Sequence, residues 1–201
     1  YYGQNQEGVL FLKAGKIGDQ GPGAGCDGPI SKIARDFKLC RNGEQPVTLV
    51  DFKAGFEASA RGAVTSLDWA IVIVDPTTAA MEIAVNMTNM VNQIKAGELP
   101  ATRHLESPEL VEIANQLFIR AKVKGVLVVL NKIKDNKTES YITTKLAEQG
   151  IKPIGIIHED SSIAISWLKG MALNGAKTKG DTERIIEKLE TAAKVYTADL
   201  P

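Results

Sequence analysis

The chain has 201 residues, of which 44% are hydrophobic and 24% are charged, and this composition suits one globular domain with its own core. Lys+Arg and Asp+Glu number 24 each, so there is no net charge to attract nucleic acid or an acidic membrane surface. There is no bilayer-length apolar run, no signal-peptide pattern and, with only Cys26 and Cys40, no disulfide framework, so we expect a cytoplasmic protein.

Short apolar runs alternate with helical stretches from the start of the chain. The first predicted strand covers residues 9–13 and reads as a buried strand. A glycine-rich loop follows, and then a helix over residues 29–39, because Pro29 suits a first helical turn. Residues 47–51 are predicted to form the second strand, and residues 57–64 a helix.

The third predicted strand, residues 69–74, is the clearest. Its near-continuous apolar character is typical of a strand that is covered on both faces of a parallel sheet. Thr77 or Thr78 is expected to cap a helix that runs to about Lys95. Ser107 and Pro108 are expected to start the next helix.

The remaining elements continue the same alternation. They are a strand over 125–130, a helix over 139–149, a strand over 153–157, and helices over 161–169 and 181–193. Repeated β-α units predict an α/β fold with a doubly wound, mostly parallel sheet and helices on both faces. We expect residues 1–201 to form a single domain of this kind.

Polar residues end four of the predicted strands, namely Asp51, Asp75, Asn131 and the run His158-Glu159-Asp160. Any one of them is an ordinary start of a loop. Ligands of such sheets bind at the carboxyl ends of the strands, however. All of these residues on one edge therefore favour a binding site there.

Five segments in chain order carry a family resemblance. They are Gly-Pro-Gly-Ala-Gly-Cys-Asp-Gly-Pro at 21–29, the strand and loop at 47–57, Val-Ile-Val-Asp-Pro-Thr at 72–77, Val-Val-Leu-Asn-Lys at 128–132, and the run from Gly155 to Ile163. Together they resemble the nitrogenase iron protein and the accessory ATPase that inserts nickel into carbon monoxide dehydrogenase. That resemblance implies a P-loop NTPase-like fold that binds ATP or ADP with Mg²⁺.

The resemblance also implies roles for individual residues. Asp51 would hold a Mg²⁺-bound water, and Gly55 would approach the γ-phosphate and move when it leaves. The Asn131 amide, which both donates and accepts, would contact the base. The nucleotide-binding residues implied by the motifs are Asn131, Lys132, Asp75 and Asp160.

Cys26 is the candidate metal ligand. A thiol at a helix N-terminus favours the thiolate, which is the form that binds metal. In the resembling families this loop lies on the two-fold axis of a homodimer, which implies a shared Zn²⁺, Ni²⁺ or iron–sulfur site. The second cysteine of either family is absent here, since Cys26 is followed by Asp27 and Gly28 and residues 56–62 contain no cysteine. A free thiol is the plain alternative, and Cys40 is expected to be an ordinary core or surface residue.

The phosphate-binding loop of these families, Gly-x-x-x-x-Gly-Lys-Ser/Thr, does not occur in the sequence. One explanation is that the first strand and its loop precede Tyr1, and the strand-like opening at residue 9 favours it. The other is a degenerate relative that no longer hydrolyses ATP. Lys53 is a further departure, because the nickel-insertion ATPase has an acidic residue there.

Three functional hypotheses follow from the resemblance. The first is a metallocentre-maturation ATPase whose homodimer delivers metal to a client metalloenzyme, which the segment Asp51–Gly55 favours. The second is an iron-protein-like ATP-dependent reductase, favoured by the cysteine loop. The third is a non-catalytic scaffold similar to MinD and ParA that binds a partner in a nucleotide-dependent way.

Overall fold

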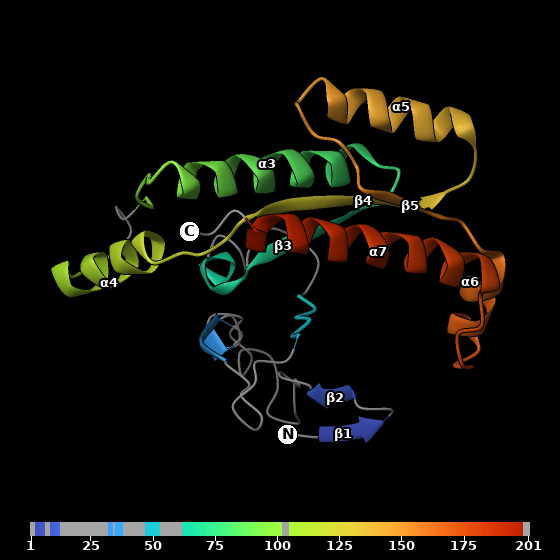
Figure 1. The fold of residues 1–201 in the computed structure, drawn as a ribbon, viewed down its shortest axis with the longest axis horizontal. Coiled ribbons are helices and arrows are strands. Elements are labelled where there is room, and N and C mark those ends of the chain that lie inside the picture. Colours follow the sequence, from blue (N-terminus) through green and yellow to red (C-terminus); the bar gives the residue numbers. More distant parts are fainter. Residues whose placement is uncertain are drawn as a thin grey trace. The chain divides into compact units, whose positions relative to one another are not determined.

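The computed structural model describes residues 3–6, 9–12, 32–33, 35–37, 47–52, 62–101 and 105–198. The chain divides into two compact units, one formed by residues 1–67 and 97–123 and the other by residues 68–96 and 124–201 (Figure 1). Cys26, Cys40, Lys53 and Gly55 lie outside the described residues.

The second unit is built on a parallel sheet of three strands, β3 (Trp69–Val74), β4 (Gly125–Ile133) and β5 (Gly155–His158), in the order β3-β4-β5. The three strands were predicted from their apolar runs, and so was their parallel pairing. β4 is longer than predicted, because it continues through Asn131 and Lys132 to Ile133.

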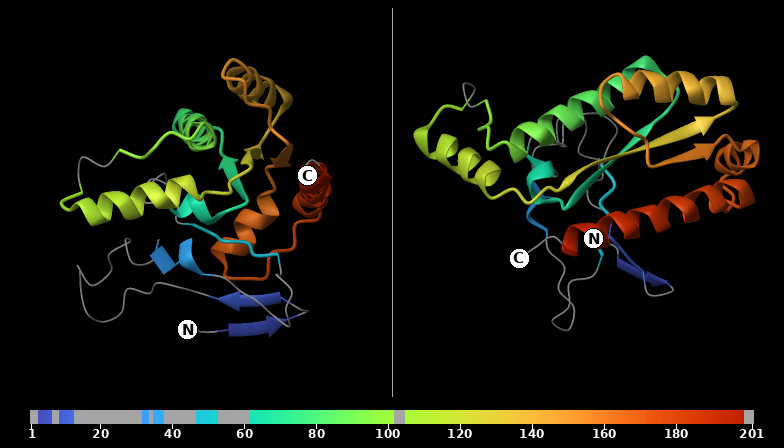
Figure 2. Two further views of the ribbon diagram at one scale, coloured as in Figure 1. Left: turned by 60° about the vertical axis from the view of Figure 1, so that its left-hand side comes forward. Right: turned by 45° about the horizontal axis from the view of Figure 1, so that its top comes forward.

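Helices cover both faces of this sheet. α3 (Thr78–Lys95) and α5 (Asn136–Ala147) lie on one face, and α7 (Ala176–Ala198) packs on β5 from the other (Figures 1 and 2). The short α6 (Ser161–Leu168) precedes α7. The predicted α/β class is confirmed, and the arrangement is consistent with a P-loop NTPase-like fold.

The main core lies between the sheet and α3. In β3 the side chains that face the core alternate with two that are exposed, Ile71 and Ile73. The prediction that this strand is covered on both faces is therefore wrong, because its second face carries these exposed side chains. α3 contributes its apolar stripe at helical spacing, Ala84, Met87, Val91 and Ile94. Burial of each large side chain contributes about 1.5–3 kcal/mol, so this interface is the main support of the sheet.

Capping side chains fix where the helices begin. The Thr77 hydroxyl accepts a hydrogen bond from the Ala80 N–H at the start of α3. The Ser107 hydroxyl does the same for the Leu110 N–H in α4 (Pro108–Ile119), which belongs to the first unit. Both starts match the sequence signals.

Two predictions for the first unit are wrong. The strand predicted at residues 9–13 forms as β2 (Val9–Leu12), but it pairs antiparallel with β1 (Gly3–Gln6) in a hairpin, and Phe11 is 61% exposed rather than buried. Residues 47–51 form no strand, and Val47 and Leu49 are exposed. A strand requires a neighbour for its N–H and C=O groups, and no described residue pairs with this segment.

The other expectations for the first unit are met in part. Of the described residues within the predicted helix at 29–39, 32–33 and 35–36 are helical and Phe37 is not. The end of the helix predicted at 57–64 is instead the 3-10 turn η1 (Ala63–Ser66).

Gly155 marks a close approach of β5 to α7. A Cβ atom at this position would lie 2.3 Å from Cγ1 of Ile185. We expect Gly155→Ala to destabilise the protein by about 2 kcal/mol through overpacking. In a double-mutant cycle measured by urea unfolding, the same change should cost less in an Ile185→Ala background, because the clashing atoms are gone.

Gly180→Ala is the matched control, since its new Cβ would meet nothing closer than 3.7 Å. This control should be neutral or slightly stabilising, because it lowers the entropy of the unfolded chain. Equal costs for the two glycine changes would contradict the close-packing account of Gly155.

Candidate functional site

Three predicted site residues meet at the carboxyl ends of β3 and β4. Asp75 follows β3 directly, and Asn131 and Lys132 belong to the end of β4. The Asn131 side-chain amide donates to one Asp75 carboxylate oxygen at 2.8 Å, and the Lys132 ammonium donates to the other at 2.7 Å. One carboxylate thus binds two neighbouring side chains.

A β-bulge makes this arrangement possible. Leu130 pairs with Ile156 and Ile133 pairs with His158, so β4 contains one more residue than β5 across this stretch. In a regular strand, consecutive side chains point to opposite faces of the sheet. Lys132 instead has a left-handed backbone with φ of 54°, and its side chain reaches the same carboxylate as that of Asn131.

The ion pair between Lys132 and Asp75 does not by itself offset the strain of the bulge. A non-glycine residue in the left-handed region costs about 1–3 kcal/mol, whereas an exposed ion pair contributes only about 0–1 kcal/mol. The side chains of Lys132 and Asp75 are 63% and 38% exposed, so their pair is of the weak kind. Non-glycine residues with a left-handed backbone are frequent at binding sites.

Three helices begin at this same edge of the sheet. Thr77 caps α3, Asp135 caps α5 and Asp160 caps α6. The first N–H groups of a helix carry partial positive charge and favour anions. This edge therefore combines an orienting carboxylate, an amide, an ammonium group and positive helix ends.

Asp160 has a local structural role. Its carboxylate accepts hydrogen bonds from the Ser162 hydroxyl at 2.6 Å and the Ser162 N–H at 3.0 Å. The Ser162 hydrogen bonds hold the pKa of the Asp160 carboxyl below its ordinary value. Within the described part of the chain, Asp160 makes no hydrogen bond to Asp75, Asn131 or Lys132.

The remaining predicted residues do not join this cluster. Asp51 is exposed in the first unit, while Gly55 and Cys26 lie outside the described residues. In the described ranges, no three His, Cys, Asp or Glu side chains gather as a metal site, and no helix has the length and apolar character needed to cross a membrane.

Sequence reasoning missed a buried carboxylate beside the end of β5. Asp181 of α7 is 2% exposed, and it accepts hydrogen bonds from the backbone N–H and the imidazole Nδ1 of His158, both at 2.9 Å, and from Arg184. Burial raises the pKa of the Asp181 carboxyl, but the His158 and Arg184 hydrogen bonds outweigh it, and the pKa lies below its ordinary value. The one sequence signal for this buried carboxylate is the i,i+3 spacing of Asp181 and Arg184 on a predicted helix.

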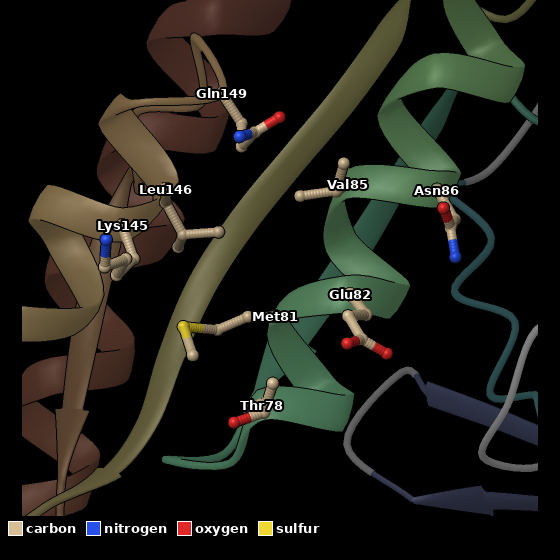
Figure 3. Close-up of a pocket in the computed structure, with 8 residues that line it drawn as sticks. All are labelled: Thr78, Met81, Glu82, Val85, Asn86, Lys145, Leu146 and Gln149. Atoms are coloured by element: carbon tan, nitrogen blue, oxygen red, sulfur yellow. The ribbon is translucent and has the colours of Figure 1, made fainter.

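A groove of about 290 Å³ lies between α3 and α5. Met81, Val85 and Leu146 form its apolar wall (Figure 3). None of Asp75, Asn131 and Lys132 lines it, so the groove is separate from the cluster at the sheet edge.

No family model matches the chain. It is similar to an uncharacterized ATP-binding protein of Methanocaldococcus jannaschii, with 20% identity over 180 residues. The match covers 88% of this chain and 58% of the relative, so the chain spans little more than half of the relative's length.

The Asp181 contacts predict an acid-sensitive attachment of α7 to β5. Asp181→Asn should lower the free energy of unfolding by about 2–3 kcal/mol at neutral pH, because it removes the buried charge from its partners. Since the folded pKa is lowered, the contribution of Asp181 is complete above its ordinary pKa of 3.8 and is lost as the pH falls through the folded value.

Urea unfolding across acidic and neutral pH measures both effects. The stability of Asp181→Asn should depend less on pH in the acidic range than that of the unmutated protein. Arg184→Ala is the control and should cost less, because its side chain is 66% exposed. An equal pH dependence with and without the Asp181 carboxyl would contradict the assignment.

Proposed function

We propose that this protein binds an adenine nucleotide at the carboxyl edge of the β3-β4-β5 sheet. The observation that carries this proposal is the bulge at Asn131 and Lys132, where both side chains bind Asp75 at a strained backbone position. Support comes from the similarity to an ATP-binding protein and from the general use of this sheet edge for ligands.

The Asn131 amide suits recognition of adenine. Its NH₂ group donates to Asp75, and this bond leaves the amide oxygen as an acceptor that faces away from the carboxylate. An amide acceptor pairs with the amino group of adenine, whereas guanine has a carbonyl oxygen at the equivalent position. Asp75 thus serves as the positioning residue of the amide, and it also holds the ammonium group of Lys132.

Nucleotide binding measured by calorimetry tests this proposal. ADP and ATP should bind more tightly than GDP and GTP, and Asn131→Ala should weaken ADP binding about tenfold, the effect of one lost hydrogen bond to a buried partner. Asn86→Ala, an exposed asparagine change on α3, is the matched control and should leave binding unchanged. Absence of adenine selectivity, or equal effects of the two variants, would rule out the base contact.

We propose further that the nucleotide serves metallocentre maturation in a homodimer. In this proposal Asp51 holds a Mg²⁺-bound water, Gly55 responds to the γ-phosphate, and Cys26 from two copies binds a shared Zn²⁺ or Ni²⁺ destined for a client metalloenzyme. The motifs that resemble the nickel-insertion ATPase support this proposal. An iron–sulfur reductase and a MinD- or ParA-like scaffold are the alternatives.

The metal content of anaerobically purified protein separates these functions. The maturation proposal expects about half a metal ion per chain in a dimer, the ratio for one ion shared by two thiolate-bearing chains. Cys26→Ser should abolish metal binding, and Cys40→Ser is the control that should not. A brown protein with visible absorption would favour the reductase, and a metal-free protein unaffected by Cys26→Ser would favour the scaffold.

A further inference from the structure

Five large apolar side chains are exposed within nine residues at the end of α6. Their exposed fractions run from 52% to 85%, with Trp167 at 76% and Leu168 at 85%. This α6 patch consists of Ile165, Trp167, Leu168, Met171 and Leu173. Single exposed apolar side chains are ordinary, but a contiguous group that includes a tryptophan marks a surface that contacts something.

The chain around the patch is cationic, although the whole chain is neutral. Residues 161–180 contain three lysines, Lys169, Lys177 and Lys179, and no acidic residue. All three lysines are exposed, and among the described residues no carboxylate lies within ion-pair distance of them.

Two of the three acidic residues that flank this segment pair with cations outside it. Glu159 lies 3.7 Å from the Lys134 ammonium, Asp160 caps α6, and Asp181 is buried with His158 and Arg184. Asp160 alone remains to offset one of the three lysine charges. Residues 160–180, which contain the apolar patch, therefore keep a net charge of +2.

We propose that the α6 patch docks on an anionic lipid surface. Exposed Trp and Leu side chains enter the interface of a bilayer, and neighbouring lysines bind the acidic headgroups. Contact with a second copy is disfavoured, since an isologous interface would bring identical lysine clusters together. A protein partner is less favoured, because lysine is depleted at protein interfaces.

From its neutral net charge, the chain was predicted to have no attraction to an acidic membrane surface. A bilayer surface responds to nearby charges, however, and not to the net charge of a whole protein. Headgroups interact with charges within about a Debye length, on the order of 8–10 Å at physiological salt. A cationic segment in a neutral protein is therefore sufficient, and no helix has to cross the membrane. The proposal is independent of nucleotide binding.

Vesicle binding with tryptophan fluorescence tests the proposal. The full chain should sediment with vesicles of phosphatidylglycerol and phosphatidylcholine and not with phosphatidylcholine alone, and high salt should release it. Its tryptophan emission should shift to the blue on binding. Trp167→Phe should remove this shift while leaving vesicle binding, because the remaining tryptophan, Trp69, lies in β3.

Two sets of matched variants test whether vesicle binding depends on the lysines and on the apolar side chains of this segment. Changing Lys169, Lys177 and Lys179 together to Gln should weaken binding about a hundredfold, or about fivefold for each charge. The same change at Lys122, Lys137 and Lys152, which are exposed outside the segment, should have little effect. Leu168→Ser should abolish binding, whereas Ile113→Ser in α4, an apolar side chain 56% exposed, should not.

Circular dichroism checks that each variant is folded, as expected for changes at exposed positions. Failure of the unmutated chain to bind anionic vesicles would overturn the proposal and leave the patch to a protein partner. Equal losses from the segment lysines and the control lysines would overturn it as well.

Discussion

The bulge at the end of β4 brings the side chains of three candidate site residues together at this edge of the sheet. One extra residue places the side chains of Asn131 and Lys132 on the same Asp75 carboxylate, at the cost of a left-handed backbone at Lys132. An exposed ion pair does not offset that cost. We therefore propose that the arrangement serves a ligand that uses the amide and the ammonium group together, and an adenine nucleotide is our candidate.

The rest of the second unit keeps that edge in place. α3 supports β3 and β4 through its buried stripe, and α7 holds β5 through two contacts of different kinds. One is the close packing of Ile185 against Gly155, and the other is the buried Asp181 that binds the last residue of β5, His158. Because β5 pairs with β4 on both sides of the bulge, the attachment of α7 also fixes the register in which the bulge occurs.

The fold of this unit was predictable from local signals, and parts of the site were not. Apolar runs predicted β3, β4 and β5, and Thr77 and Ser107 marked helix starts, because periodicity and caps act within a few residues. Asp75, Asn131 and Lys132 were placed at the strand ends correctly. The bulge that joins them and the Asp181–His158 contact depend on pairing between distant segments, which no local pattern encodes. The segment 47–51 shows the converse, since its strand-like sequence forms no strand in the described structure.

Chemical-shift mapping by NMR, with backbone amides and asparagine side chains observed during titration with ADP, tests the central claim most directly. Binding at the proposed edge should shift the signals of Asp75 to Thr78 and of Asn131 to Ile133, including the Asn131 side-chain amide. The amides near Trp69 and Gly125, which pair with each other at the opposite edge of the same sheet, should not move. Shifts confined to that opposite edge, or to the groove between α3 and α5, would contradict the account.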